Sequence, residues 1–167
     1  FRTFQGWTAL TEQGPNDGTL QLIPIAKGMA YVLTRALLDD VPENELCGSK
    51  AGKALSINEK YHSLLLEGLI SIPKMYPGDT IWWHPDVVHA VEEKHMGKTF
   101  SNVIYVGATP YCKKNIDYIK KQSKKFIEGK SPPDFAAEDY EVNYKGRTKI
   151  NDLSELAKKQ LGLIDWN

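Results

Sequence analysis

The sequence predicts a mainly β fold of the sandwich or jelly-roll type, followed by helices. Short runs of β-branched and aromatic residues, separated by Gly, Pro, Asn and Asp, recur through the first 110 positions. After that point the pattern changes to apolar residues at helical spacing among lysines. We therefore expect a β core over 1–110 and a helical extension over 111–167 that packs on this core.

The first two predicted strands are Phe1 to Leu10 and Thr19 to Ile25, which are rich in residues that favour extended backbone. Between them, Thr11 to Gly18 is dense in turn residues. A strand, a turn and a second strand in this order predict a β-hairpin.

Residues 27–68 depart from the β pattern and are predicted to form an excursion from the core. Lys27 to Leu38 has partial helical spacing, and Asp39 to Lys60 is polar with several glycines. Tyr61 to Leu69 fits either a helical turn or an extended segment. Long polar loops such as Asp39 to Lys60 are often functional, but the sequence does not say whether this one acts as a lid.

The β pattern then resumes with three further strands. Gly68 to Met75 leads into the turn Pro77-Gly78-Asp79, and the apolar run Thr80 to Trp83 follows. Phe100 to Val106 is the clearest strand pattern in the chain.

Two helices are predicted in the last third of the chain. Asn115 to Glu128 is amphipathic with a lysine-rich face, and Gly129 is placed to end it. Asp152 to Leu161 is the second helix, with Asn151 or Asp152 as its N-cap.

Three potential metal ligands, His84, Asp86 and His89, directly follow the predicted strand that ends at Trp83. Two histidines and one carboxylate form the metal-binding triad of non-haem Fe(II) oxygenases, and the same groups suit a local Zn or Ni site. On a strand, however, His84 and Asp86 share one face and His89 lies on the other. The alternative is that His84 and Asp86 cap the strand end while His89 is a packed histidine.

Other aromatic and histidine residues are given structural interpretations. Trp7, Trp82 and Trp83 are predicted to be core residues. His62 and His95 lie in polar surroundings and are predicted to be on the surface.

The composition excludes several classes of protein. The 21 basic and 21 acidic residues cancel, so we expect no nucleic-acid partner. No apolar run reaches the roughly 20 residues of a membrane span, so we expect no membrane association. The two cysteines, Cys47 and Cys112, have no metal-binding or redox spacing, which favours a reducing compartment such as the cytoplasm.

The order of strands and turns resembles the second half of the double-stranded β-helix of Fe(II)/2-oxoglutarate oxygenases, a cupin-like jelly roll. It is similar in outline to the phytanoyl-CoA dioxygenase branch. Individual motifs resemble the uncharacterised DUF1479 family more closely. These motifs are FRTFQGWTAL at 1–10, GTLQLIP at 18–24, GDTIWWHPDVVHAV at 78–91, SPPDF at 131–135 and GL at 162–163.

The resemblance implies a role for His89 as the distal metal histidine. It also implies that the proximal His-x-Asp pair lies upstream of Phe1, since His84-Pro85-Asp86 has these letters on the wrong strand. The chain begins without Met inside a predicted strand. We therefore expect it to be the C-terminal part of a longer polypeptide whose upstream half completes the site.

The Fe(II)/2-oxoglutarate oxygenases that the chain resembles commonly bind 2-oxoglutarate through an Arg on the last core strand. The corresponding strand here, Phe100 to Val106, contains no Arg. The candidates that remain are Arg2 and Lys98, with Ser101 as an added hydrogen-bond donor. Alternatively, Arg2 forms a salt bridge at the strand edge and Lys98 is solvated.

Two functions from different classes follow. The first is an oxygenase-like protein that uses Fe(II) and 2-oxoglutarate to hydroxylate a small-molecule substrate, incomplete in this stretch of chain. The second is a non-catalytic, cupin-like binding module or structural protein, because a fold alone does not confer function.

Overall fold

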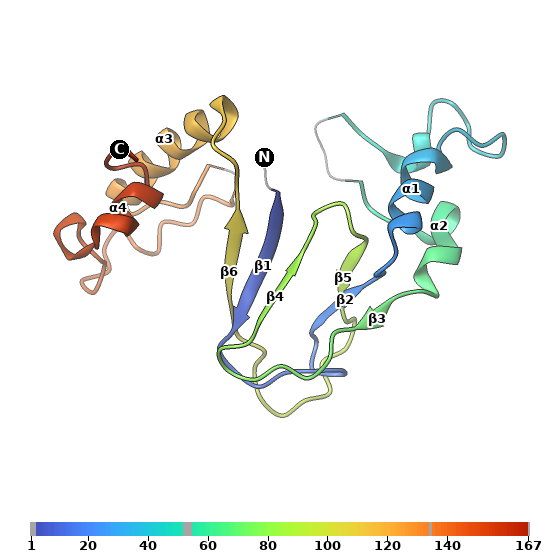
Figure 1. Ribbon diagram of the computed structural model, residues 1–167, viewed down its shortest axis with the longest axis horizontal. Helices are drawn as coiled ribbons and strands as arrows, with labels where there is room; N and C mark the ends of the chain where they lie inside the picture. The colour runs from blue at the N-terminus through green and yellow to red at the C-terminus, as the bar shows by residue number, and fades with distance from the viewer. Residues whose placement is uncertain (1–2, 52–54, 134, 167) are drawn as a thin grey trace. The chain divides into compact units, whose positions relative to one another are not determined.

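Two antiparallel sheets contain the six strands of the computed structural model, which describes residues 3–51, 55–133 and 135–166 (Figure 1). The first sheet has the order β4-β1-β6, with bounds Thr80–Trp83, Phe4–Ala9 and Val103–Ala108. The second sheet has the order β3-β2-β5, with bounds Ile70–Ser71, Leu20–Leu22 and His89–Val91. The chain divides into two compact units between Ala108 and Thr109.

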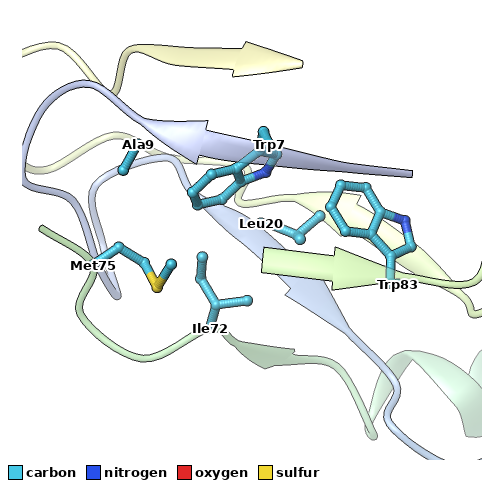
Figure 2. Packing of buried hydrophobic residues seen from close by; sticks show 6 residues of the cluster. All are labelled: Trp7, Ala9, Leu20, Ile72, Met75 and Trp83. Carbon is cyan, nitrogen blue, oxygen red and sulfur yellow. The ribbon is translucent and has the colours of Figure 1, made fainter. Parts of the chain in front are cut away.

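The two sheets share one hydrophobic core. Trp7 and Ala9 project from the inward face of β1, and Trp83 of β4 lies opposite Gln5 of that same face. Figure 2 shows these side chains directed towards one another with those of the second sheet and its connections. The buried set is Trp7, Ala9, Leu20, Ile72, Met75 and Trp83. Burial of this apolar surface holds the two sheets together.

The predicted hairpin of the first two strands is wrong. β1 pairs with β4 and β6, whereas β2 pairs with β3 and β5. The connecting segment contains a β-turn, in which the Asp17 N–H donates to the Gly14 carbonyl at 3.0 Å, but this turn does not pair the two strands, and Gln13 beside it pairs with Met75 instead. Turn residues mark the connection correctly but do not determine which strands pair.

The excursion contains two helices that contact each other, α1 (Ala26–Arg35) and α2 (Glu59–Leu66), and the short helix η1 (Leu46–Gly48). Arg35 joins the two helices, since its Nε donates to the Tyr61 carbonyl at 2.8 Å. The same guanidinium forms a two-point ion pair with Asp40. The segment Tyr61 to Leu69 is helical for most of its length, since α2 ends at Leu66.

The second unit is built on α3 (Lys113–Glu128), followed by η2 (Ile150–Asp152) and α4 (Glu155–Gln160). The prediction that Gly129 ends the long helix is confirmed, since this residue has a φ of 72°. The predicted N-caps of the last helix are wrong: Ser154 is the cap, because its Oγ accepts from the Ala157 N–H at 3.1 Å. Among the described residues, no helix is long and apolar enough to cross a membrane.

The antiparallel sheets agree with the predicted class, but the chain is mixed α/β rather than mainly β. The four α-helices together contain more residues than the strands, because three strands have only two or three residues. Proline limits two of these short strands, since Pro24 follows β2 and Pro73 follows β3 closely. The finer assignment to half of a double-stranded β-helix stays a prediction.

Candidate functional site

His89 is the first residue of β5, and the core fixes its position. The preceding residue, Val88, packs against Ile23 and Leu65. The Val88 carbonyl accepts a hydrogen bond from the Ile23 N–H at 3.0 Å, and the His89 backbone pairs with Leu22. The imidazole thus projects from a well-anchored strand end.

A backbone hydrogen bond selects the tautomer of His89. Its Nδ1 lies 2.7 Å from the Val87 carbonyl oxygen, which can only accept, so Nδ1 carries the proton. In the neutral ring, Nε2 then carries the lone pair that binds metals or accepts hydrogen bonds. Many metal-binding histidines are oriented by the same Nδ1–H bond to a backbone carbonyl.

Two residues of the other sheet flank this imidazole. The side-chain amide of Gln5 lies 3.1 Å from His89 Nε2 and donates to it. The Trp83 ring centroid lies 5.7 Å from that of His89, with the planes tilted by 56°. We call Gln5, Trp83 and His89 the His89 cluster.

The Trp83 side chain is 7% exposed, and its indole Nε1–H has no hydrogen-bond partner among the described residues. A buried donor without a partner is uncommon in folded proteins and raises the question of what it binds.

The structure does not bring His84 and Asp86 together with His89. Register places Phe4 on the outward face of β1, and the His84 ring lies edge-on to it at 6.1 Å. His84 Nδ1 is 3.7 Å from an Asp86 oxygen, and it also accepts from the Asp86 N–H at 3.2 Å. These two residues cap the end of β4 locally, on the face opposite to the one that His89 contacts.

Of the predicted 2-oxoglutarate anchors, Ser101 lies away from His89. Val103 pairs with Ala9 and Gly107 pairs with Gln5, so Ser101 precedes the end of β6 that is remote from His89. The distance from Val103 to Gly107 alone is about 13 Å along a strand. The Ser101 hydroxyl already donates to the Asp17 carbonyl at 2.6 Å. Lys98 is exposed, and Arg2 lies outside the described residues.

Within the described parts of the chain, no three His, Cys, Asp or Glu side chains are grouped to hold a metal ion. His89 therefore fits as a single ligand, to which other donors must be added for a complete metal site.

Comparison with known proteins places the chain in a family. The profile of the Gig2-like family matches residues 1–163. This chain belongs to the Gig2-like family. The uncharacterised protein YbiU of Escherichia coli K12 is 49% identical over 163 residues. That match covers 98% of this chain and 39% of YbiU.

Solved structures agree with this assignment. A Salmonella typhimurium LT2 protein, solved under the name "Putative Oxidoreductase", has a TM-score of 0.88 and 48% identity. The match covers 97% of this chain and 39% of the Salmonella protein. GIG2 (DUF1479) of Candida albicans, named GlcNAc Inducible Gene 2, has a TM-score of 0.83 and 29% identity, with 100% of this chain and 41% of that one covered. The predicted DUF1479 membership is confirmed, and the chain spans about two fifths of its relatives.

Sequence reasoning did not identify Gln5 or Trp83 as site residues of this Gig2-like chain. The signal for Gln5 was the two-residue alternation of β1, which places it on the same face as Trp7 and Ala9. Trp82, predicted to be in the core with its neighbour, is 47% exposed, because adjacent strand residues face opposite sides.

His62 was predicted to be on the surface, but its side chain is fully buried. Its Nδ1 accepts from the Asn58 N–H at 3.3 Å, and its Nε2 has no partner among the described residues. The packing of α2, which sequence polarity does not report, accounts for this difference.

The excursion carries a separate, open cavity of about 550 Å³, lined by residues that include Glu45, Lys60 and Tyr61. Lys60 and the Tyr61 hydroxyl both bond to the Glu45 carboxylate. Because Glu45 and Lys60 of this cavity are already paired with each other, we take the His89 cluster as the stronger candidate site.

Proposed function

We propose that this Gig2-like chain contributes His89 as one iron ligand of an oxygenase-like site that hydroxylates a small-molecule substrate with 2-oxoglutarate. The observation that carries the proposal is the Nδ1 hydrogen bond to the Val87 carbonyl, which leaves Nε2 for the metal. Imidazole is a suitable ligand for non-haem Fe(II), together with a second histidine and a carboxylate.

The remaining two ligands would come from outside this stretch of the polypeptide. The resemblance to Fe(II)/2-oxoglutarate oxygenases implies an upstream His-x-Asp pair, and the relatives are more than twice as long as this chain. Bound Fe(II) and 2-oxoglutarate would supply the activation of dioxygen for C–H hydroxylation. The oxidoreductase name of the Salmonella protein supports this class of chemistry.

The residues of this chain would hold and orient the site. The Val87 carbonyl keeps the His89 proton on Nδ1, and the β5 backbone fixes the ring position. The Gln5 amide holds Nε2 until a metal replaces it there. The Trp83 ring lies beside the imidazole, with its centroid 5.7 Å from that of His89, and would line one side of the site.

The proposal is tested by the conversion of 2-oxoglutarate to succinate in the full-length protein loaded with Fe(II). His89→Ala should abolish succinate formation, while His84→Ala, which changes a histidine on the opposite face of β4, should retain it. Equal activity in His89→Ala and the wild-type protein would refute the role of His89.

A second candidate function is a non-catalytic binding module. The observation in its favour is that the described residues provide one candidate ligand and no arginine on β6. This function predicts no succinate formation by the full-length protein under any metal, together with retained small-molecule binding.

A further inference from the structure

The indole N–H of Trp83 is a buried donor that the fold leaves unpaired. Trp83 is 7% exposed, and Nε1 has no partner among the described residues. Figure 2 shows the nitrogen on the side of the ring away from Leu20. Leaving such a group unpaired costs stability, so a ligand that accepts from it gains affinity.

The surroundings of this donor point to the His89 cluster. Trp83 lies directly opposite Gln5 in the β1–β4 pairing, and its ring packs on His89. The Trp83 ring and the Gln5 amide therefore both lie beside the imidazole, and each carries an N–H donor.

On the inward face of the first sheet, Tyr105 of β6 lies opposite Trp7 and is 78% exposed, whereas Trp7 itself is buried. Because Nε1 of Trp83 is shielded from solvent, only a group that enters the fold beside this ring can accept from it.

We propose that Trp83 and Gln5 donate their side-chain N–H groups to a carboxylate of the small molecule that binds beside His89. This inference adds a binding group for the small molecule to the proposed function, and it depends on that function only for the metal at His89. An indole N–H can only donate, so it requires an acceptor. A carboxylate offers two oxygens to two donors and forms stronger hydrogen bonds than a neutral acceptor.

The assignment differs from the anchors predicted from sequence. Ser101 lies towards the other end of β6, whereas Trp83 and Gln5 adjoin the imidazole directly. Both side chains are uncharged, so the site requires no buried salt bridge.

The test is a titration of the full-length protein with 2-oxoglutarate under anaerobic, iron-free conditions, with and without Zn(II). The indole ¹⁵N–¹H signals are recorded by NMR, and the Trp83 signal is identified by its loss in Trp83→Phe. The chemical shift of the Trp83 signal should change when 2-oxoglutarate binds. The dimethyl ester of 2-oxoglutarate, which lacks the negative charges, should leave this chemical shift unchanged.

Affinity measured by calorimetry provides the matched comparison. Trp83→Phe keeps an aromatic ring but removes the donor, and should weaken 2-oxoglutarate binding roughly tenfold. Trp82→Phe makes the same change on the opposite face and should alter the dissociation constant less than twofold.

The inference is overturned if no 2-oxoglutarate binds, if it binds without moving the Trp83 signal, or if the ester moves that signal equally. Equal effects of the two Phe variants also overturn it. If Trp83→Phe does not fold, the titration of the wild-type protein tests the inference. The Trp83 signal is then assigned through backbone connectivity, and the spectrum of Trp82→Phe identifies the signal of the neighbouring indole. A moving Trp83 signal without iron-dependent succinate formation refutes the proposed function and leaves this inference standing.

Discussion

The Nε2 atoms of Gln5 and His89 lie 3.1 Å apart, although these residues are 84 positions apart in sequence and belong to different sheets. The contact joins the exposed imidazole of β5 to β1 of the other sheet, at the nitrogen that we propose as the metal ligand. A metal at this nitrogen would release the Gln5 amide, which could then bind an incoming ligand.

Gly6 is predicted to be intolerant of a side chain. A Cβ at this position would clash with the Ile81 carbonyl oxygen and lie 2.8 Å from the Trp82 ring. Because the Ile81 carbonyl is part of the neighbouring strand, it cannot move freely. Gly6→Ala should reduce the free energy of unfolding by about 2 kcal/mol in urea denaturation.

Gly28→Ala is the matched control for this substitution. Its Cβ would make ordinary contacts of 3.5 Å or more, and Gly28 lies within α1. Alanine there should raise the free energy of unfolding by up to about 1 kcal/mol. Similar losses in both variants would contradict the close packing of β1 on β4.

Glu92 is predicted to stabilise the loop that precedes β2. Partial burial raises the pKa of Glu92, but hydrogen bonds from the Ser71 hydroxyl and from the backbone of Asn16, Gly18 and Thr19 outweigh it and lower the pKa below its ordinary value. Glu92→Gln should therefore cost roughly 1.5–3 kcal/mol at neutral pH.

The pH dependence of the same residue follows from the sign of this shift. A lowered pKa means that the Glu92 contribution is present above the unfolded value of about 4.5 and is lost as pH falls through the folded value. Thermal melts from pH 7 to 3 should show a smaller acid-induced decrease in Glu92→Gln than in Glu93→Gln. The exposed neighbour provides the control, and identical profiles would remove Glu92 from this role.

His62 is predicted to destabilise the fold when it is protonated. Burial lowers the pKa of His62, and the nearby positive charge of Arg35 lowers it further. Its contribution is complete above the unfolded value of about 6.5 and is lost as pH falls through the folded value. Chemical denaturation of His62→Gln should be less sensitive to pH between 7 and 5 than that of the wild-type protein. An unchanged slope would show that another group titrates.

Ser154 is predicted to be required for the start of α4. Because its Oγ accepts from the Ala157 N–H, Ser154→Ala should destabilise this helix by about 1 kcal/mol. Hydrogen exchange of the α4 amides should accelerate in Ser154→Ala and remain unchanged in Asn151→Ala. Faster exchange in Asn151→Ala and unchanged exchange in Ser154→Ala would instead support Asn151 as the N-cap, as the sequence predicted.

Local patterns predicted the elements that depend on neighbouring residues. The run from Thr80 to Trp83 became β4 with the predicted bounds, and Gly129 ends α3 as expected. Each depends on turn or cap residues within a few positions.

Features that depend on distant residues were not predictable in the same way. The hairpin prediction was wrong because strand pairing brings Gln13 to Met75, and the burial of His62 depends on helix packing. His89 was singled out as a candidate from its residue type, and its role as a metal ligand stays a prediction. Its neighbours Gln5 and Trp83 were not singled out, because their contacts arise only when the two sheets pack together.

The most direct test of the role of His89 is the anaerobic titration of the full-length protein with Fe(II) and 2-oxoglutarate, followed by visible absorption. We predict a weak metal-to-ligand charge-transfer band that is lost in His89→Ala and retained in His84→Ala. A band of equal intensity in His89→Ala, or no band in a folded, iron-loaded protein, would contradict the assignment of His89 as an iron ligand.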